Sequence, residues 1–208
     1  MNFILEQLQK KYTIILASSS QRRKQLLNSI GLIFEIIVPD IDEEKLVFDT
    51  TPQNYCKFLS VAKARSVYHS VLKLNKPVIV ITADTIVVLN NEIINKPKDN
   101  NDAINILKKL SNNKHKVFTG VSLLSINDRR VRIINRYSET DVYFRKLNND
   151  EIIDYVSTGS PLDKAGGYGI QDDYGCLFVK KINGCYNNVV GLPLELLYEM
   201  FRIISLDL

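Results

Sequence analysis

Histidine and cysteine are scarce in this 208-residue sequence, which has two histidines and three cysteines. His69 and His115 lie far apart along the chain, which argues against a histidine-based metal site and against a Ser-His-Asp triad. Cys56, Cys176 and Cys185 are odd in number and form no Cys-x-x-Cys pair. This pattern is typical of a reducing cytosol and argues against a disulfide framework. We therefore expect a cytoplasmic protein.

Long apolar runs and long runs of one charge are also absent. No apolar stretch approaches the ~20 residues that a membrane-spanning helix needs. Residues 1–11 lack the sustained apolar core of a signal peptide. The net charge is only +4, with no block of five basic residues, and this balance suits a small anionic ligand such as a nucleotide. We therefore expect neither a membrane nor a nucleic acid as partner.

The composition is that of a globular protein, with 45% apolar and 24% charged residues,. The length suits one well-packed domain or two closely joined lobes. Helical and strand patterns alternate, with several hairpins and no internal repeat. This order predicts an α/β fold with a mixed sheet. Strands are expected at 33–38, 92–95, 116–126, 131–145 and 177–182, and helices at 99–110, 150–156 and 194–204, besides the elements that carry the candidate residues below.

A serine- and arginine-rich segment, LASSSQRR (residues 16–23), joins a predicted strand at 12–16 to a predicted helix at 22–30. Such a turn directs backbone N–H groups and the positive end of the helix dipole at one spot. The hydroxyls and guanidiniums there suit phosphate oxygens. It is not a Walker loop, because it has no glycine and no Gly-Lys-Ser/Thr. Two interpretations stay open: an anion-binding loop, or a serine N-cap followed by two solvated arginines.

Carboxylates stand out at two places. The turn DIDEE (residues 40–44) has four carboxylates, which repel one another unless a cation or solvent relieves the repulsion. A cation site and a solvated loop therefore both stay open as interpretations. Asp84 interrupts the most hydrophobic run, residues 77–89, where a carboxylate without a partner is expensive to bury. We therefore interpret Asp84 as a functional residue.

Two further segments carry polar candidates. Residues 52–72 predict a long amphipathic helix with Lys63 in its middle. Its apolar side is expected to carry Tyr55, Phe58, Leu59, Ala62, Val67 and Leu72. Residues 158–171, with four glycines and a proline, predict a loop that a ligand can approach closely. Asp163, Lys164 and Gln171 are its polar candidates.

Seven motifs now form a colinear set. They are LASSSQRR (16–23), IDEE (41–44), TADT (82–85), KP (96–97), FTGVSL (118–123), DKAGGYGIQ (163–171) and NVVGLPL (188–194). The set resembles the Maf family of nucleoside triphosphate pyrophosphatases, in the family's order and over nearly the whole chain.

The resemblance implies one Maf-like domain over residues 1–208. It implies an elongated mixed sheet flanked by helices, with two lobes and a cleft, similar to inosine triphosphate pyrophosphatases. It also implies hydrolysis of a nucleoside triphosphate to the monophosphate and pyrophosphate, a divalent cation (Mg²⁺ or Mn²⁺) and a homodimer. Cleavage between the α- and β-phosphates itself requires charge neutralisation and an aligned water.

The resemblance gives Asp84 the role of proton acceptor. A carboxylate near a cation could equally be a metal ligand, so we assign both Glu43 and Asp84 to the metal. Thr85 and Gln171 are expected to read the base edge, since an amide both donates and accepts hydrogen bonds. The groups expected to bind the triphosphate are Ser18, Ser20, Arg22, Arg23, Lys63, Lys96 and Lys164.

Branch-specific positions favour pyrimidine substrates. The branch acting on dTTP and UTP carries the equivalents of Arg22, Thr85 and Gln171, so we expect hydrolysis of dTTP, UTP and modified pyrimidine triphosphates. The branch acting on 7-methyl-GTP carries a tryptophan in the first loop, and this chain has none. Two positions depart from the family pattern: Gln21 replaces the usual proline and Ser160 replaces the usual glutamate.

Three alternatives compete with this interpretation. A non-catalytic nucleotide-binding regulator of cell division is disfavoured because Asp84, Glu43 and the lysines are intact. A nucleic-acid-binding protein is disfavoured by scattered lysines and the lack of a stacking aromatic motif. A pyrophosphatase with another base preference, such as 7-methyl-GTP, is the alternative within the enzyme class.

Overall fold

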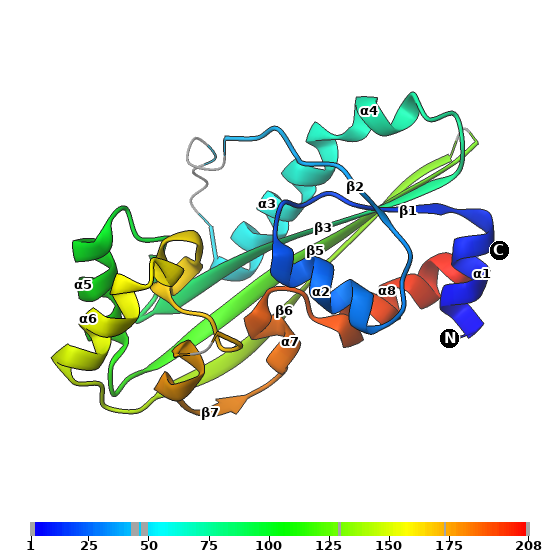
Figure 1. The fold of residues 1–208 in the computed structure, drawn as a ribbon. Coiled ribbons are helices and arrows are strands. Elements are labelled where there is room, and N and C mark those ends of the chain that lie inside the picture. The colour runs from blue at the N-terminus through cyan, green and yellow to red at the C-terminus, as the bar shows by residue number, and fades with distance from the viewer. Residues whose placement is uncertain (1–2, 43–45, 47–49, 129, 173, 207–208) are drawn as a thin grey trace. The chain divides into compact units, whose positions relative to one another are not determined.

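The computed structural model describes residues 3–42, 46, 50–128, 130–172 and 174–206 (Figure 1). The strands are β1 (Thr13–Leu16), β2 (Glu35–Ile36), β3 (Val78–Leu89), β4 (Glu92–Ile94), β5 (Lys114–Asn127), β6 (Arg130–Phe144) and β7 (Val179–Asn183). The helices are α1 (Phe3–Lys11), α2 (Gln21–Ser29), α3 (Pro52–Ser66), α4 (Tyr68–Leu72), α5 (Asn100–Leu110), α6 (Asn149–Ser157), α7 (Tyr186–Val190) and α8 (Leu194–Ser205). Three 3₁₀ turns, η2 (Ser160–Asp163), η3 (Ala165–Gly167) and η4 (Gly175–Phe178), complete the described chain.

The described strands form one mixed sheet in the order β2-β1-β3-β5-β6-β7, with β4 paired to β3. Strand β1 runs parallel to both β2 and β3, whereas the pairs β3–β4 and β6–β7 are antiparallel. The predicted α/β fold with a mixed sheet flanked by helices is therefore confirmed. Among the described residues, no helix is long and apolar enough to cross a membrane.

The chain divides into two compact units. The first comprises Met1–Asp84, Thr119–Ser138 and Gly191–Leu208, and the second comprises Thr85–Phe118 and Glu139–Val190. Strands β3, β5 and β6 contribute residues to both units. The division falls immediately after Asp84, so Asp84 belongs to the first unit and Thr85 to the second.

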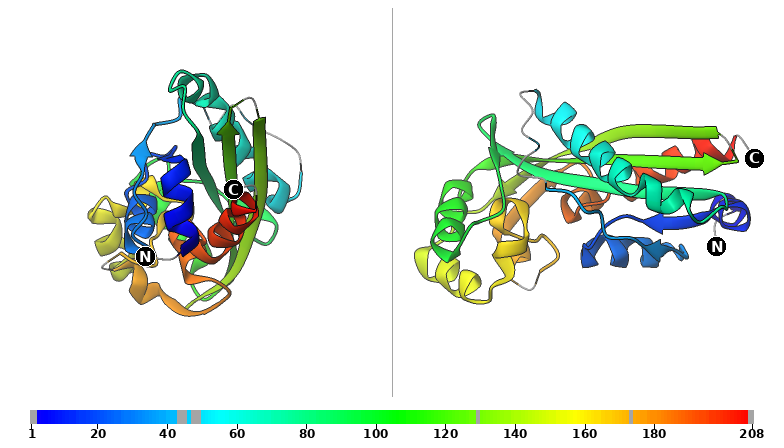
Figure 2. Two further views of the ribbon diagram at one scale, coloured as in Figure 1. Left: turned by 90° about the vertical axis from the view of Figure 1, so that its right-hand side faces the viewer. Right: turned by 90° about the horizontal axis from the view of Figure 1, so that it is seen from above.

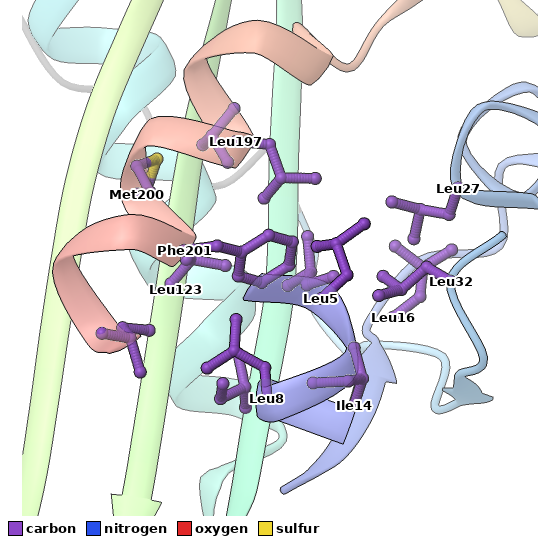
Figure 3. Close-up of a cluster of buried hydrophobic side chains, with 14 of the residues drawn as sticks. Leu5, Leu8, Ile14, Leu16, Leu27, Leu32, Leu123, Leu197, Met200 and Phe201 are labelled. Atoms are coloured by element: carbon purple, nitrogen blue, oxygen red, sulfur yellow. The ribbon is translucent and has the colours of Figure 1, made fainter. Parts of the chain in front are cut away.

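In the first unit the sheet is covered on both faces. One face packs against α1, α2 and α8, and Figure 3 shows Leu5 and Phe201 within this cluster. Helices α1 and α8 contact each other (Figure 2). Ile14 of β1 belongs to this face, whereas Ile15 belongs to the opposite cluster, which is formed with α3 and α4. Burial on both faces explains why these strands read as continuous apolar runs.

The apolar side predicted for the helix at 52–72 was wrong in part. Phe58 is 36% exposed and Leu72 is 42% exposed. The side chains that are buried instead are Cys56, Leu59, Ser60, Lys63, Ala64, Val67 and Val71. Two of these are polar and find partners inside the protein, so hydropathy alone placed the buried face too far around the helix axis.

Gly120 lets α3 lie close to β5. A Cβ at this position would fall 2.2 Å from the carbonyl oxygen of Cys56. That distance is impossible for a real side chain, and the obstructing atom belongs to the backbone of α3. Glycine inside a strand is thus required here by the approach of a second backbone.

In the second unit, α5 and α6 contact each other (Figure 2). Helix α5 buries the predicted residues Ala103, Ile106, Leu107 and Leu110. An aromatic cluster forms its core, with edge-to-face contacts among His115, Phe144, Tyr155, Tyr168 and Phe178. His115 Nε2 lies 2.8 Å from the Tyr168 hydroxyl, and both residues are buried.

Several predicted elements differ in detail. The strand expected at 33–38 shrinks to Glu35–Ile36, and both of its residues are exposed. The strand expected at 177–182 begins only at Val179, after η4. Helices α1 and α7 were not predicted. The single helix expected at 52–72 is divided into α3 and α4, which meet at Val67. The remaining predicted strands and helices are present within a few residues of their expected ends.

Candidate active site

Asp84 is placed by the alternation of β3. Val78 and Val80 pack on the α3 side of the sheet, so Thr82 and Asp84 point the same way. The Thr82 hydroxyl donates to the carbonyl of Ser60 in α3 at 2.7 Å. Three residues later on the same helix face, Lys63 Nζ donates to Asp84 Oδ1 at 2.5 Å. The register of one strand and one helix therefore brings two predicted site residues together.

The Lys63–Asp84 pair is buried, with side chains 9% and 7% exposed. A carboxylate in such surroundings needs a compensating charge, and Lys63 provides it. The charge of Asp84 also affects the thiol of Cys56. Burial, and secondly the negative charge of Asp84, raise the pKa of Cys56 to about 12. The thiol of Cys56 therefore stays neutral. The charged groups at this place are the Lys63 ammonium and the Asp84 carboxylate.

A polar network fixes this part of α3 to the sheet. The hydroxyls of Ser60 and Ser122 lie 2.8 Å apart. Asn135 Nδ2 of β6 donates to them at 3.0 and 2.8 Å. Because every distance is that of a good hydrogen bond, the helix turn that carries Lys63 is anchored to the sheet.

The serine-arginine segment forms the predicted strand-to-helix turn between β1 and α2. Ser20 caps α2 and accepts a hydrogen bond from the backbone of Arg23 at 3.5 Å. Ser18 Oγ accepts from Ser20 N at 3.2 Å and from Arg23 Nη1 at 3.3 Å. Arg23 Nε also donates to the carbonyl of Gly191 at 2.9 Å. The N-cap interpretation is thus correct for Ser20, but Arg23 is anchored rather than solvated.

The second unit gathers Lys164 and Gln171 around a carboxylate that the sequence analysis missed. Lys164 is buried, and its Nζ lies 2.6 Å from Asp163 Oδ1 and 3.1 Å from Asp172 Oδ2. Gln171 Nε2 donates to Asp172 Oδ1 at 2.9 Å. The glycine-rich motif ends at Gln171, one residue short of this carboxylate. A carboxylate directly beside a polar candidate was nevertheless a usable signal.

Comparison with known proteins decides the family. The sequence model of the Maf-like proteins matches residues 13–204. This chain belongs to the Maf-like family. A relative described as "dTTP/UTP pyrophosphatase" from Clostridium botulinum (strain Eklund 17B / Type B) is 47% identical, over 91% of this chain and 97% of that protein. Another with the same description, from Clostridium beijerinckii, is 44% identical over 92% and 99%.

A solved structure was also matched. It is described as "Nucleoside-triphosphatase / dITP/XTP pyrophosphatase" from Mycobacterium abscessus. Its TM-score is 0.35 at 13% identity, covering 64% of this chain and 72% of that one. The family assignment stands on the sequence matches alone.

Three further predicted residues of this Maf-like chain lie on or next to described elements. Arg22 lies in the first turn of α2, Thr85 is half-buried in β3, and Lys96 is exposed just after β4. Glu43 lies outside the described residues. Within the described part of the chain, no three His, Cys, Asp or Glu side chains form a metal-binding group.

Proposed function

We propose that this Maf-like protein hydrolyses dTTP and UTP to the nucleoside monophosphate and pyrophosphate. The relatives that carry this description are 44–47% identical over nearly their full lengths. The single structural observation that supports the activity is the buried Lys63–Asp84 pair, held at 2.5 Å on the fixed turn of α3. A chain that had kept only a binding role would have little reason to keep an expensive buried ion pair.

Asp84 is proposed to accept the proton of the attacking water, as a general base. Lys63 engages Oδ1, so Oδ2 is the oxygen proposed to face the water or a cation. The lysine orients the carboxylate and compensates its charge. Because the Asp84 carboxylate is held by packing and by the hydrogen bond from Lys63 to Oδ1, little reorganisation of the carboxylate is needed at the moment of reaction.

The groups proposed to bind the triphosphate are cationic and hydroxyl donors, and residues 1–208 are proposed to act as one domain. In the first unit these are Ser18, Ser20, Arg22 and Arg23, at the N-terminal end of α2, where backbone N–H groups and the helix dipole favour an anion. Lys63 of α3 is the further cation proposed in this unit. In the second unit they are Lys96 and Lys164. Guanidinium and ammonium groups stabilise the charge on the departing pyrophosphate.

A divalent cation, Mg²⁺ or Mn²⁺, is part of the proposal. Mg²⁺ in nucleotide enzymes is usually held by one or two carboxylates together with the substrate phosphates. Asp84 Oδ2 fits that requirement, and Glu43 is the proposed second carboxylate. When bound, the cation would neutralise phosphate charge and lower the pKa of a bound water.

A panel of triphosphates tests this function. Initial rates are measured with dTTP, UTP, GTP and 7-methyl-GTP, and pyrophosphate and orthophosphate are assayed separately. We expect dTTP and UTP to be the best substrates, because Arg22, Thr85 and Gln171 match the pyrimidine branch. Preference for GTP or 7-methyl-GTP would refute the assigned base specificity. The homodimer implied by the resemblance remains a prediction for sedimentation measurements.

A further inference from the structure

Asp172 is the centre of a hydrogen-bonded cluster in the second unit. Its Oδ2 accepts from Ser160 Oγ at 2.9 Å and from the Tyr155 hydroxyl at 3.4 Å, and it lies 3.1 Å from Lys164 Nζ. Its Oδ1 accepts from Gln171 Nε2 at 2.9 Å. The two carboxylate oxygens therefore bind different groups. Oδ2 holds the lysine and the hydroxyls, and Oδ1 holds only the Gln171 amide among these groups.

The surroundings are shaped for this carboxylate. A Cβ on Gly169 would lie 2.4 Å from Asp172 Cγ, so only glycine at 169 leaves room for the side chain. Burial raises the pKa of Tyr155 to about 12, so its hydroxyl keeps its proton and donates to Asp172. Asp172 is thus built into the loop rather than solvated beside it.

The cluster fixes which way the Gln171 amide points. An ionised carboxylate only accepts hydrogen bonds, so the group of Gln171 that faces Asp172 is the NH₂ and not the carbonyl. The carbonyl oxygen, Oε1, then points away from Asp172. It is buried and has no hydrogen-bond partner among the described residues. An acceptor left in this condition is costly in a folded protein, and a ligand N–H that pairs with it removes the cost.

We propose that Asp172 is a specificity-determining positioning residue, which presents the Gln171 carbonyl as an acceptor for the N3–H of uracil or thymine. The inference rests on the proposed function and extends it. Uracil and thymine carry a donor at N3, whereas cytosine carries an acceptor there. Cytosine therefore places a lone pair against the Gln171 oxygen, and a locked amide cannot turn to relieve it.

The experiment measures kcat/KM for UTP and CTP in the wild-type protein and in Asp172→Asn. In the wild type we expect UTP to be favoured by about tenfold to a hundredfold, the usual effect of one unmade hydrogen bond in a closed site. The amide that replaces the Asp172 carboxylate both donates and accepts, so the Gln171 amide can rotate. We expect the UTP/CTP ratio to fall at least about fivefold, through a gain or a smaller loss with CTP.

Two control variants separate orientation of Gln171 from pairing with Lys164. Asp163→Asn removes the other carboxylate at Lys164 Nζ but not the bond to Gln171, so the UTP/CTP ratio should stay unchanged. Ser160→Glu with Asp172→Asn restores a negative charge near Lys164, because Ser160 Oγ lies 3.2 Å from Nζ. Compared with Asp172→Asn alone, this double variant should be more stable and should have a higher overall rate, while its UTP/CTP ratio stays low.

The outcomes are distinct. An unchanged ratio in Asp172→Asn and in the double variant would overturn the inference, as would equal hydrolysis of UTP and CTP by the wild type. In both cases pyrophosphate release would still support the proposed function. Absence of pyrophosphate release from any triphosphate would instead overturn the proposed function, and the inference with it.

Discussion

Lys63 Nζ lies 2.5 Å from Asp84 Oδ1, and the two side chains are 9% and 7% exposed. One residue comes from the middle of α3 and the other from β3, which pack together in the first unit. The pair combines a group suited to chemistry with the charge that makes its burial tolerable. Its two halves should therefore respond differently to substitution.

Asp84→Asn should lower kcat for dTTP by about 10²-fold or more, as expected for loss of a general base or of a cation-held water. The measurement is kcat at saturating dTTP and cation. Asp154→Asn, an exposed aspartate on α6, is the matched control and should keep its turnover. Near-normal turnover in Asp84→Asn would remove Asp84 from the mechanism.

Lys63→Met should destabilise the fold by about 3–5 kcal/mol, because it leaves a buried carboxylate without this partner. Urea unfolding monitored by circular dichroism measures the change. Adding Asp84→Asn to Lys63→Met should recover a large part of the loss, since no isolated charge then remains buried. If the double variant were as unstable as the sum of the two single variants, the two residues would not be energetically coupled.

Gly120→Ala should destabilise the protein by about 1–3 kcal/mol or more, because the new methyl group meets the backbone of Cys56 rather than a flexible side chain,. Gly31→Ala is the comparison. Gly31 has φ +71 and open space around it, so it suffers only backbone strain of roughly 1–2 kcal/mol. A smaller loss for Gly120→Ala than for Gly31→Ala would mean that α3 can move away from β5 at little expense.

His115 should make the fold sensitive to acid. Burial lowers the pKa of His115 from 6.5 to about 3, so between these values the unfolded chain binds a proton that the folded protein does not. This contribution to stability is complete above pH 6.5 and is lost as the pH falls toward 3. Between about pH 7 and about pH 5 it should remove about 2 kcal/mol from the free energy of unfolding.

The matched variant for this prediction is His115→Gln, which can still bond the Tyr168 hydroxyl but does not titrate. Its free energy of unfolding should fall less than that of the wild type over the same pH interval. Equal losses in the two proteins would show that His115 is not the group responsible.

Much of the fold was predictable because local patterns and tertiary structure agree. The apolar run at 77–89 became the central strand β3, and Asn90 and Asn91, both at positive φ, form the predicted hairpin turn. The failures occur where a polar residue is buried. Lys63 is hydrophilic by any scale, so a hydropathy pattern predicts that it faces solvent. It is buried because it pairs with Asp84 on another element, β3.

The candidate site was predicted mainly through motifs rather than through geometry. Asp84 stood out because a carboxylate inside an apolar strand is expensive, whereas its partner, 21 residues away, could not be inferred without the register of α3 on β3. The position of Asp172 directly after Gln171 was a usable signal, but its other partners could not be inferred. A loop has no periodicity, so the sequence does not indicate that Ser160, Lys164 and Gln171 converge on one carboxylate.

The most direct test of the central claim is the identity of the products released from dTTP by the wild-type protein. The reaction, without added inorganic pyrophosphatase, is followed by ³¹P NMR and anion-exchange chromatography. Hydrolysis between the α- and β-phosphates predicts dTMP and pyrophosphate in equal amounts, with neither dTDP nor orthophosphate in the early phase. Equal amounts of dTDP and orthophosphate would contradict it.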